Sequence, residues 1–143
     1  MDIGVELVMV AQIIVAFVLS GIIGFEHEMQ ENPAGIRTYA AVTLTAVLLT
    51  LIGVHSPDAT ASSRIMVKVV TGIGFMGAGI IYNNIANRPT HGLTTASSIW
   101  GAAGIGVAVA YNMYFIAVGA TVAIYFLLAL QHVKWYIKLN TKA

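Results

Sequence analysis

The chain has 143 residues, of which 58% are hydrophobic and only 9% are charged, and its formal net charge is +1 at pH 7. Soluble domains carry roughly a quarter charged residues, so this composition predicts a single membrane domain over 1–143, and the small net charge gives no reason to expect a nucleic-acid partner. Cysteine is absent, which excludes disulfides, thiol chemistry and cysteine-ligated metals.

Five apolar segments follow one another, each near the roughly 20 residues that a membrane-spanning helix needs. We expect an all-α, polytopic membrane bundle whose helices cover approximately 7–25, 38–54, 65–82, 93–110 and 113–130. Each of the first three separating segments contains a proline, which favours a loop because proline cannot donate the helical hydrogen bond. The fourth separator is only Tyr111-Asn112. If these two residues do not break the chain, the last two helices form one long, bent element.

The distribution of lysine and arginine predicts how the chain crosses the membrane. With the N-terminus outside, the outer segments hold only Arg64 and Lys68, and the remaining basic residues fall inside. The inner basic residues are Arg37, Arg88, Lys134, Lys138 and Lys142. We therefore expect an outside N-terminus and a cytoplasmic C-terminus. This threading brings the first and second helices, and the third and fourth, together at the cytoplasmic face, where we expect any site to lie.

Glycines in the third predicted helix include the G-x-G-x-x-G spacing of a dinucleotide-binding turn. That fold also needs a full helix after the glycines and an acidic residue about 20 positions further on, but no Asp or Glu follows Asp58. Small residues instead allow close helix packing in a membrane. The alternative is that they unwind the helix and expose carbonyl groups to a cation in a pore. The packing or pore candidates of this helix are Gly72, Gly74, Gly77 and Gly79.

Two carboxylates end the first predicted helix. Glu28 shares a helical stripe with Gly21 and Gly24, so it points toward a packing interface, whereas Glu26 lies about 200° round the helix. The two acids therefore address different neighbours. Arg37 begins the second helix, where the positive end of the helix dipole disfavours a cation. One of these glutamates is its expected partner, and a lipid phosphate is the alternative.

Carboxylates beside hydroxyl and amide oxygens would suit Mg²⁺, a hard cation that prefers oxygen ligands. Glu26 and Glu28 are the metal candidates, and the adjoining helix ends supply Asn83, Asn84, Thr94 and Thr95. The alternative for Thr94 or Thr95 is that it caps the fourth helix. Trp100 is expected to pack within the bundle. The scattered histidines and few acids form no catalytic set, so we expect neither enzymatic activity nor an organic cofactor.

Four motifs, in order, resemble the MgtC/SapB family of bacterial inner-membrane proteins. They are GIIGFEHE (21–28), AGIRT (34–38), TGIGFMGAGII (71–81) and GLTTASSIW (92–100). The resemblance covers nearly the whole membrane region, although His27 stands where the family usually has arginine. It implies a multi-pass protein of the bacterial inner (plasma) membrane. Many members continue into a soluble cytoplasmic domain, which we expect this chain to lack.

The resemblance further implies a role in coping with low magnesium, which matters for virulence and intracellular survival in some bacteria. Members are discussed as Mg²⁺ transporters and as regulators of other membrane proteins, including the ATP synthase. We place transport or low-Mg²⁺ adaptation through an inner-face site first and regulation close behind. The expected partners are the lipid bilayer, a second copy of the chain through small-residue packing, and another membrane protein.

Carried over by position, the metal candidates are Glu26 and Glu28, and the ion-pair or gating candidates are Arg37 and Thr38. The pore or helix-packing candidates from the same resemblance are Gly74, Gly77, Gly79, Thr94, Thr95 and Trp100. The polar and small residues around them add Gly72, Asn83 and Ser98.

Overall fold

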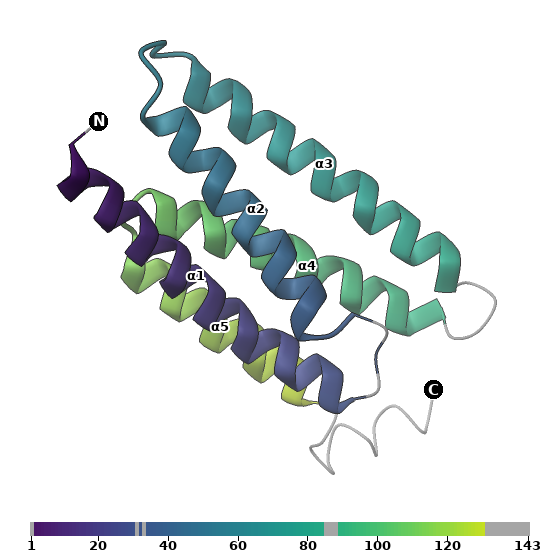
Figure 1. Cartoon of the computed structure of the whole chain (residues 1–143). Helices are drawn as coiled ribbons and strands as arrows, with labels where there is room; N and C mark the ends of the chain where they lie inside the picture. The colour runs from purple at the N-terminus through teal and green to yellow at the C-terminus, as the bar shows by residue number, and fades with distance from the viewer. Residues whose placement is uncertain (1, 31, 33, 85–88, 131–143) are drawn as a thin grey trace.

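The computed structural model describes residues 2–30, 32, 34–84 and 89–130, with the side chains of 83, 84 and 89–91 outside that description. These residues form five helices and no strand, which confirms the predicted all-α class (Figure 1). The helices are α1 (Ile3–Met29), α2 (Ile36–Val54), α3 (Ala61–Asn84), α4 (Pro89–Ala110) and α5 (Tyr114–Ala129).

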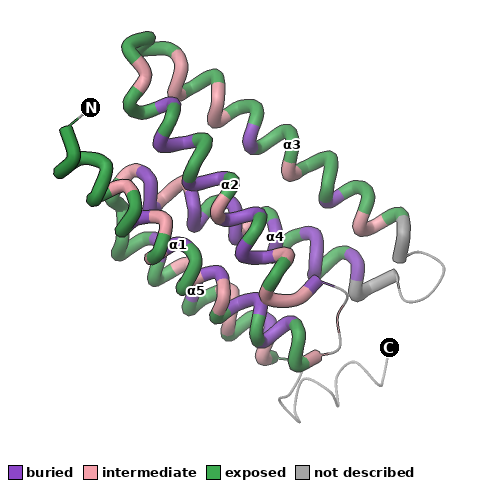
Figure 2. Tube along the Cα trace, in the orientation of Figure 1, coloured by how far each residue is buried: buried purple, intermediate pink, exposed green. Residues whose placement is uncertain are grey.

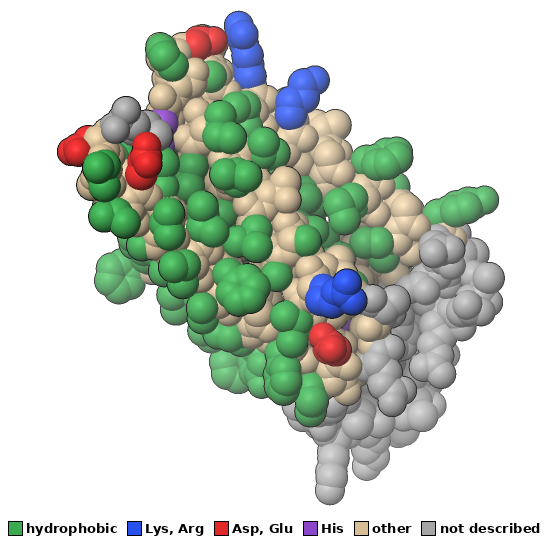
Figure 3. Space-filling view, in the orientation of Figure 1, with side chains coloured by type: hydrophobic (Ala, Val, Ile, Leu, Met, Phe, Trp, Pro, Cys, Tyr) green, Lys and Arg blue, Asp and Glu red, His purple; other side chains and the backbone are tan. Residues whose placement is uncertain are grey.

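Four helices are long and apolar enough to cross a membrane: α1, α2, Ala61–Tyr82 of α3 and Gly92–Ala110 of α4. Twenty helical residues rise about 30 Å, the thickness of the hydrocarbon core. The described part of α5 is apolar and shorter, at 16 residues. On the face shown in Figure 3, charged side chains gather toward the two ends and hydrophobic ones fill the region between. The protein is therefore a membrane protein.

α4 lies at the centre of the bundle and packs against all four other helices (Figure 1). Within the described residues, α3 packs only against α2 and α4 and forms one edge. The end of α1, the start of α2, the end of α3 and the start of α4 lie at one end of the bundle, here called the α1–α2 end. The connection from α2 to α3 lies at the opposite end. The predicted gathering of these helix ends is confirmed, and the side of the membrane that each end faces stays a prediction.

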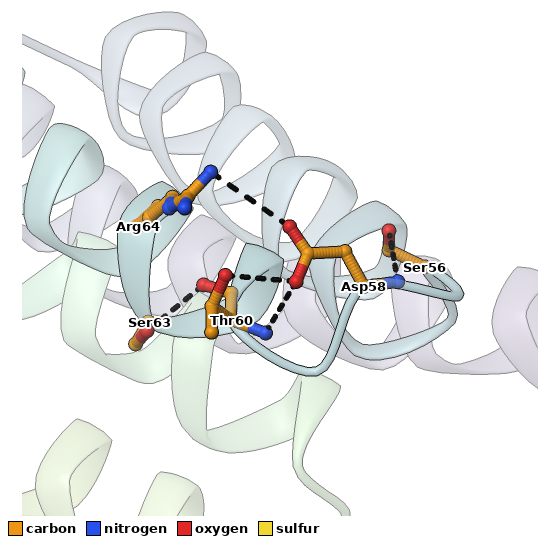
Figure 4. Close-up of polar contacts among 5 residues, drawn as sticks. All are labelled: Ser56, Asp58, Thr60, Ser63 and Arg64. Atoms are coloured by element: carbon orange, nitrogen blue, oxygen red, sulfur yellow. Dashed lines mark hydrogen bonds and ion pairs between the residues drawn. The ribbon is translucent and has the colours of Figure 1, made fainter.

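The turn between α2 and α3 is held by Asp58 (Figure 4). Its Oδ1 accepts hydrogen bonds from the backbone N–H and the hydroxyl of Thr60, both at 2.8 Å. Arg64 lies 3.7 Å from its other oxygen, forming the one ion pair within the described residues. The hydrogen bonds from Thr60 lower the pKa of Asp58 below its ordinary value. A carboxylate here also favours the start of α3, because the N-terminal end of a helix is positive.

The Tyr111-Asn112 separator is a turn, so the alternative of one long, bent element is wrong. Asn112 has a φ of 60°, a conformation that asparagine tolerates better than most residues. Gln12 of α1 stabilises this point: its Nε2 donates to the carbonyl of Val109 at 3.0 Å and of Ala110 at 3.3 Å. The last carbonyls of a helix have no partner within the helix, so the side chain of α1 satisfies the end of α4.

Buried residues concentrate where α1, α2 and α4 meet (Figure 2). Glycine permits two close approaches there. A Cβ on Gly24 would fall 2.6 Å from the Cα of Ile36, and a Cβ on Gly106 would fall 2.6 Å from the carbonyl oxygen of Thr43. The hydroxyl of Thr43 donates to the carbonyl of Ala102 at 3.1 Å, which links α2 to α4.

Candidate functional site at the α1–α2 end

The two glutamates of α1 contact different neighbours, as the helical spacing predicted. Glu26 is buried and accepts a hydrogen bond from Gln30 Nε2 at 2.9 Å. Gln30 also donates to the carbonyl of Leu128 at 3.2 Å, so this side of α1 faces α5. Glu28 is exposed, and its Oε2 accepts the backbone N–H of Ile36 at 3.0 Å, at the start of α2.

Glu28 acts as a cap for α2 that comes from the preceding helix. The first N–H groups of a helix have no internal partner and favour a carboxylate. Gly35 leaves the space for it, because a Cβ there would lie 2.6 Å from Glu28 Oε2. The glycine of the AGIRT motif thus allows the carboxylate to reach the α2 terminus.

Glu28, Asn32, Arg37 and Thr38 line an open cavity of about 700 Å³ between α1, α2 and α3. Arg37 is exposed at the second residue of α2. Within the described residues, no ion pair joins Arg37 to either glutamate. The cavity therefore presents a positive and a negative group that are not paired with each other.

His27 is the centre of a buried polar network that joins α1, α2 and α4. Its Nδ1 lies 2.7 Å from Asn32 Nδ2, and its Nε2 lies 3.3 Å from Ser98 Oγ. Ser98 Oγ also lies 2.5 Å from the hydroxyl of Tyr39, whose ring centroid is 5.2 Å from that of His27. The hydroxyl of Ser98 also donates to the carbonyl of Thr94 at 2.8 Å, so the network includes the backbone of α4.

The predicted polar candidates of α4 differ in environment. Ser98 and Thr95 are buried and Thr94 is exposed. Trp100 is 55% exposed on the outside of α4, so the prediction that it packs inside the bundle is wrong. Neither threonine caps α4, because the helix already begins at Pro89, so that alternative is wrong. Asn83 and Asn84 belong to α3, and their side chains lie outside the described part of the chain.

The glycines of α3 are divided between two surroundings. A Cβ on Gly77 would lie 3.6 Å from the Cβ of Ala96, so Gly77 faces α4. A Cβ on Gly72, Gly74 or Gly79 would meet no described atom within 4 Å. The backbone is helical throughout 72–79, so the alternative of an unwound helix is wrong.

The oxygen-bearing side chains at the α1–α2 end are poorly arranged to bind Mg²⁺ tightly. Among the described residues, no group of three or more His, Asp or Glu side chains is arranged to hold a metal. Glu26 and Glu28 face different neighbours, and Arg37 shares the cavity of Glu28. A nearby cation opposes the binding of a second one.

Two polar residues of the bundle were missed from the sequence. Local sequence patterns assign no role to His27, one of four scattered histidines, or to Gln12, which lies within the first apolar segment. Both are buried. Their burial could have been predicted from their polarity alone. An unsatisfied polar group in hydrocarbon is costly, so a polar side chain in a membrane helix usually faces a partner inside the bundle.

Comparison with known proteins gives a match to the MgtC family model over residues 13–134. The chain is 36% identical to an uncharacterized protein of Haemophilus influenzae over 128 residues, which are 83% of this chain and 53% of that protein. It is 36% identical to Protein MgtC of Salmonella typhimurium over 116 residues, 80% of this chain and 48% of that protein. It is 28% identical to Protein SapB of Bacillus subtilis over 132 residues, 87% of this chain and 56% of that protein.

The chain thus spans about half the length of the curated relatives that it matches. No solved structure matches it.

Proposed function

The chain belongs to the MgtC family, and from that premise we propose that it serves magnesium homeostasis in the bacterial inner membrane by binding and modulating other membrane proteins. The family name links its members to magnesium. Of the two modes that the sequence left open, regulation has the stronger geometric support.

The observation that carries this proposal is the exposed side of α3, here called the α3 outer face. Its residues are Thr71, Gly74, Phe75, Ala78, Gly79 and Tyr82, all exposed. Only 11% of the apolar window of α3 is buried, against 56% for α4. In lipid, helices associate where small residues let backbones approach. Gly74 and Ala78 have the small-x-x-x-small spacing and are exposed among the described residues, so they are available to a helix of another protein.

The test uses co-purification with the ATP synthase, the partner implied by the family resemblance, from bacterial membranes at low magnesium. Gly74→Leu and Ala78→Leu should each lower recovery of the synthase by roughly tenfold or more, because a bulky side chain separates the two backbones. Val67→Leu, at an exposed position of the same helix, is the matched control and should retain the partner. Full recovery with both variants contradicts the proposal.

A second copy of the chain is the other occupant that the α3 outer face would accept. Cross-linking between cysteines placed at Gly74, in a mixture of tagged and untagged chains, distinguishes a second copy of the chain from a different membrane protein. Recovery of homodimer alone, with no synthase at any magnesium level, assigns the face to self-association and contradicts the regulatory proposal.

Mg²⁺ transport is the other function that the sequence predicts, and a flux measurement distinguishes it from the regulatory proposal. We expect Mg²⁺ uptake into proteoliposomes to stay within about twofold of protein-free vesicles, since the described acids are separated and Arg37 lines the cavity of Glu28. Uptake well above this background that disappears in Glu26→Gln and Glu28→Gln would restore transport as the function.

A further inference from the structure

A groove between α2 and α3 is not used by the proposed function. It consists of the cavity of about 700 Å³ at the α1–α2 end and a second cavity of about 360 Å³ further along the two helices. Ala41, Val42 and Met76 line both cavities, so the two adjoin one another along α2 and α3. Each volume lies within the roughly 300–1,000 Å³ of small-molecule sites.

The length and lining of this α2–α3 groove match one acyl chain. Arg37 lines its first cavity and Leu49 its second, and these residues are separated by about 18 Å along α2 at 1.5 Å per residue. One leaflet of the hydrocarbon core is roughly 15 Å deep, half of 30 Å. The deeper cavity is mostly apolar. Its Thr45 hydroxyl is satisfied by the carbonyl of Ala41 at 2.8 Å.

The charges at the mouth of the groove match a zwitterionic headgroup. Glu28 and Arg37 line the same cavity with opposite charges and do not pair with each other within the described residues. Arg37 forms charge-assisted hydrogen bonds to phosphate, and a carboxylate accepts them from a primary ammonium group. A dication is disfavoured in this groove because Lys68 lines its deeper cavity and Arg37 its mouth.

We propose that the α2–α3 groove binds one phospholipid with an ethanolamine headgroup. Arg37 holds the phosphate, Glu28 accepts a hydrogen bond from the ammonium group, and one acyl chain lies along Val42 and Met76. This binding site goes beyond the proposed function, which rests on the α3 outer face. Phosphatidylcholine has no N–H to donate to Glu28, and phosphatidylglycerol has no cation there, so the site discriminates between headgroups.

The experiment is a lipid titration of the delipidated full chain, followed by native mass spectrometry. Phosphatidylethanolamine, phosphatidylcholine and phosphatidylglycerol with identical acyl chains are the probes. We expect roughly tenfold tighter retention of phosphatidylethanolamine, as one charge-assisted hydrogen bond would give. Glu28→Gln should remove this preference, and Arg37→Gln should weaken the retention of all three lipids.

Ala41→Trp tests the groove itself, because Ala41 is exposed where the two cavities join. It should reduce retention of phosphatidylethanolamine by about tenfold or more, since the indole occupies the path of the acyl chain. Ala11→Trp, at an exposed position of α1, is the matched control and should bind as the wild type does. Equal retention of the three lipids by the wild type, or unchanged retention by Ala41→Trp, overturns the proposal.

Discussion

α2 and α3 are neighbouring membrane-spanning helices, but the bundle uses them differently. Half of the apolar window of α2 is buried and only 11% of that of α3. Among the described helices, α2 packs against α1, α3 and α4, whereas α3 contacts only α2 and α4. Small residues are present in both regions. Around α2 they bring backbones together, and on the exposed side of α3 they meet no other part of the described chain.

The comparison teaches that glycine has two uses in a membrane helix. Gly24 and Gly106 stand where another backbone passes so closely that a methyl group would collide with it. A Cβ on Gly74 or Gly79 would meet no atom of the described residues within 4 Å. Since lipid gives helices no hydrophobic drive to associate, the first pair holds this bundle together and the second is available to an external helix.

The largest expected effect separates these two classes of glycine. Gly106→Ala should lower the free energy of unfolding by about 1–3 kcal/mol, the usual cost of overpacking, because the new Cβ would meet the carbonyl oxygen of Thr43. Gly74→Ala should raise it by up to about 1 kcal/mol through helix propensity. Thermal unfolding in detergent measures both.

Gly24→Ala repeats the test for the enclosed glycines and should behave as Gly106→Ala does. Gly79→Ala repeats it for the glycines of the α3 outer face and should behave as Gly74→Ala does. The comparison fails if Gly106→Ala and Gly24→Ala unfold at the wild-type temperature while the α3 variants unfold below it.

An intermediate effect is expected at Gln12, in the packed region. Gln12→Met keeps a side chain of similar length but cannot donate to the carbonyls of Val109 and Ala110. Measured hydrogen bonds between membrane helices average about 0.6 kcal/mol with a maximum near 1.7, so we expect a loss of roughly 1 kcal/mol. Ile14→Met, at an exposed position of the same helix, should leave the unfolding midpoint unchanged. A loss in the control equal to that in Gln12→Met contradicts the assigned role.

The smallest effect is expected at Asp58, where α3 begins. Its folded-state pKa is lowered by Thr60, so its contribution to stability is present above the unfolded-state pKa and is lost as the pH falls through the folded-state pKa. Asp58→Ala should therefore lower the unfolding midpoint slightly at neutral pH, and the difference should disappear in acid.

Asp58→Asn controls for the charge at this turn, because its amide oxygen still accepts the hydrogen bonds of Thr60. An Asp58→Ala defect that persists unchanged in acid contradicts the role of the ionised carboxylate.

Much of this arrangement could be predicted from the sequence. Four apolar segments of spanning length require helices in lipid, because every backbone polar group needs an internal partner there. The separation of Glu26 and Glu28 follows from helical geometry alone. His27 could not be placed in the same way, since its partners Ser98 and Tyr39 come from α4 and α2, and no local spacing indicates that three helices meet at one point.

The amino-acid sequence by itself therefore determined the membrane class, the five helices, the turn positions and the divergence of the two glutamates, because these depend on hydrophobicity and local backbone geometry. Only the tertiary structure decided that Gly106 is enclosed and Gly74 is open, that Gln12 completes the end of α4, and that Glu28 and Arg37 share one groove. These outcomes depend on which faces of distant helices meet. In lipid, that choice is made by the detailed fit of small and polar side chains, since hydrophobicity does not distinguish one apolar face from another.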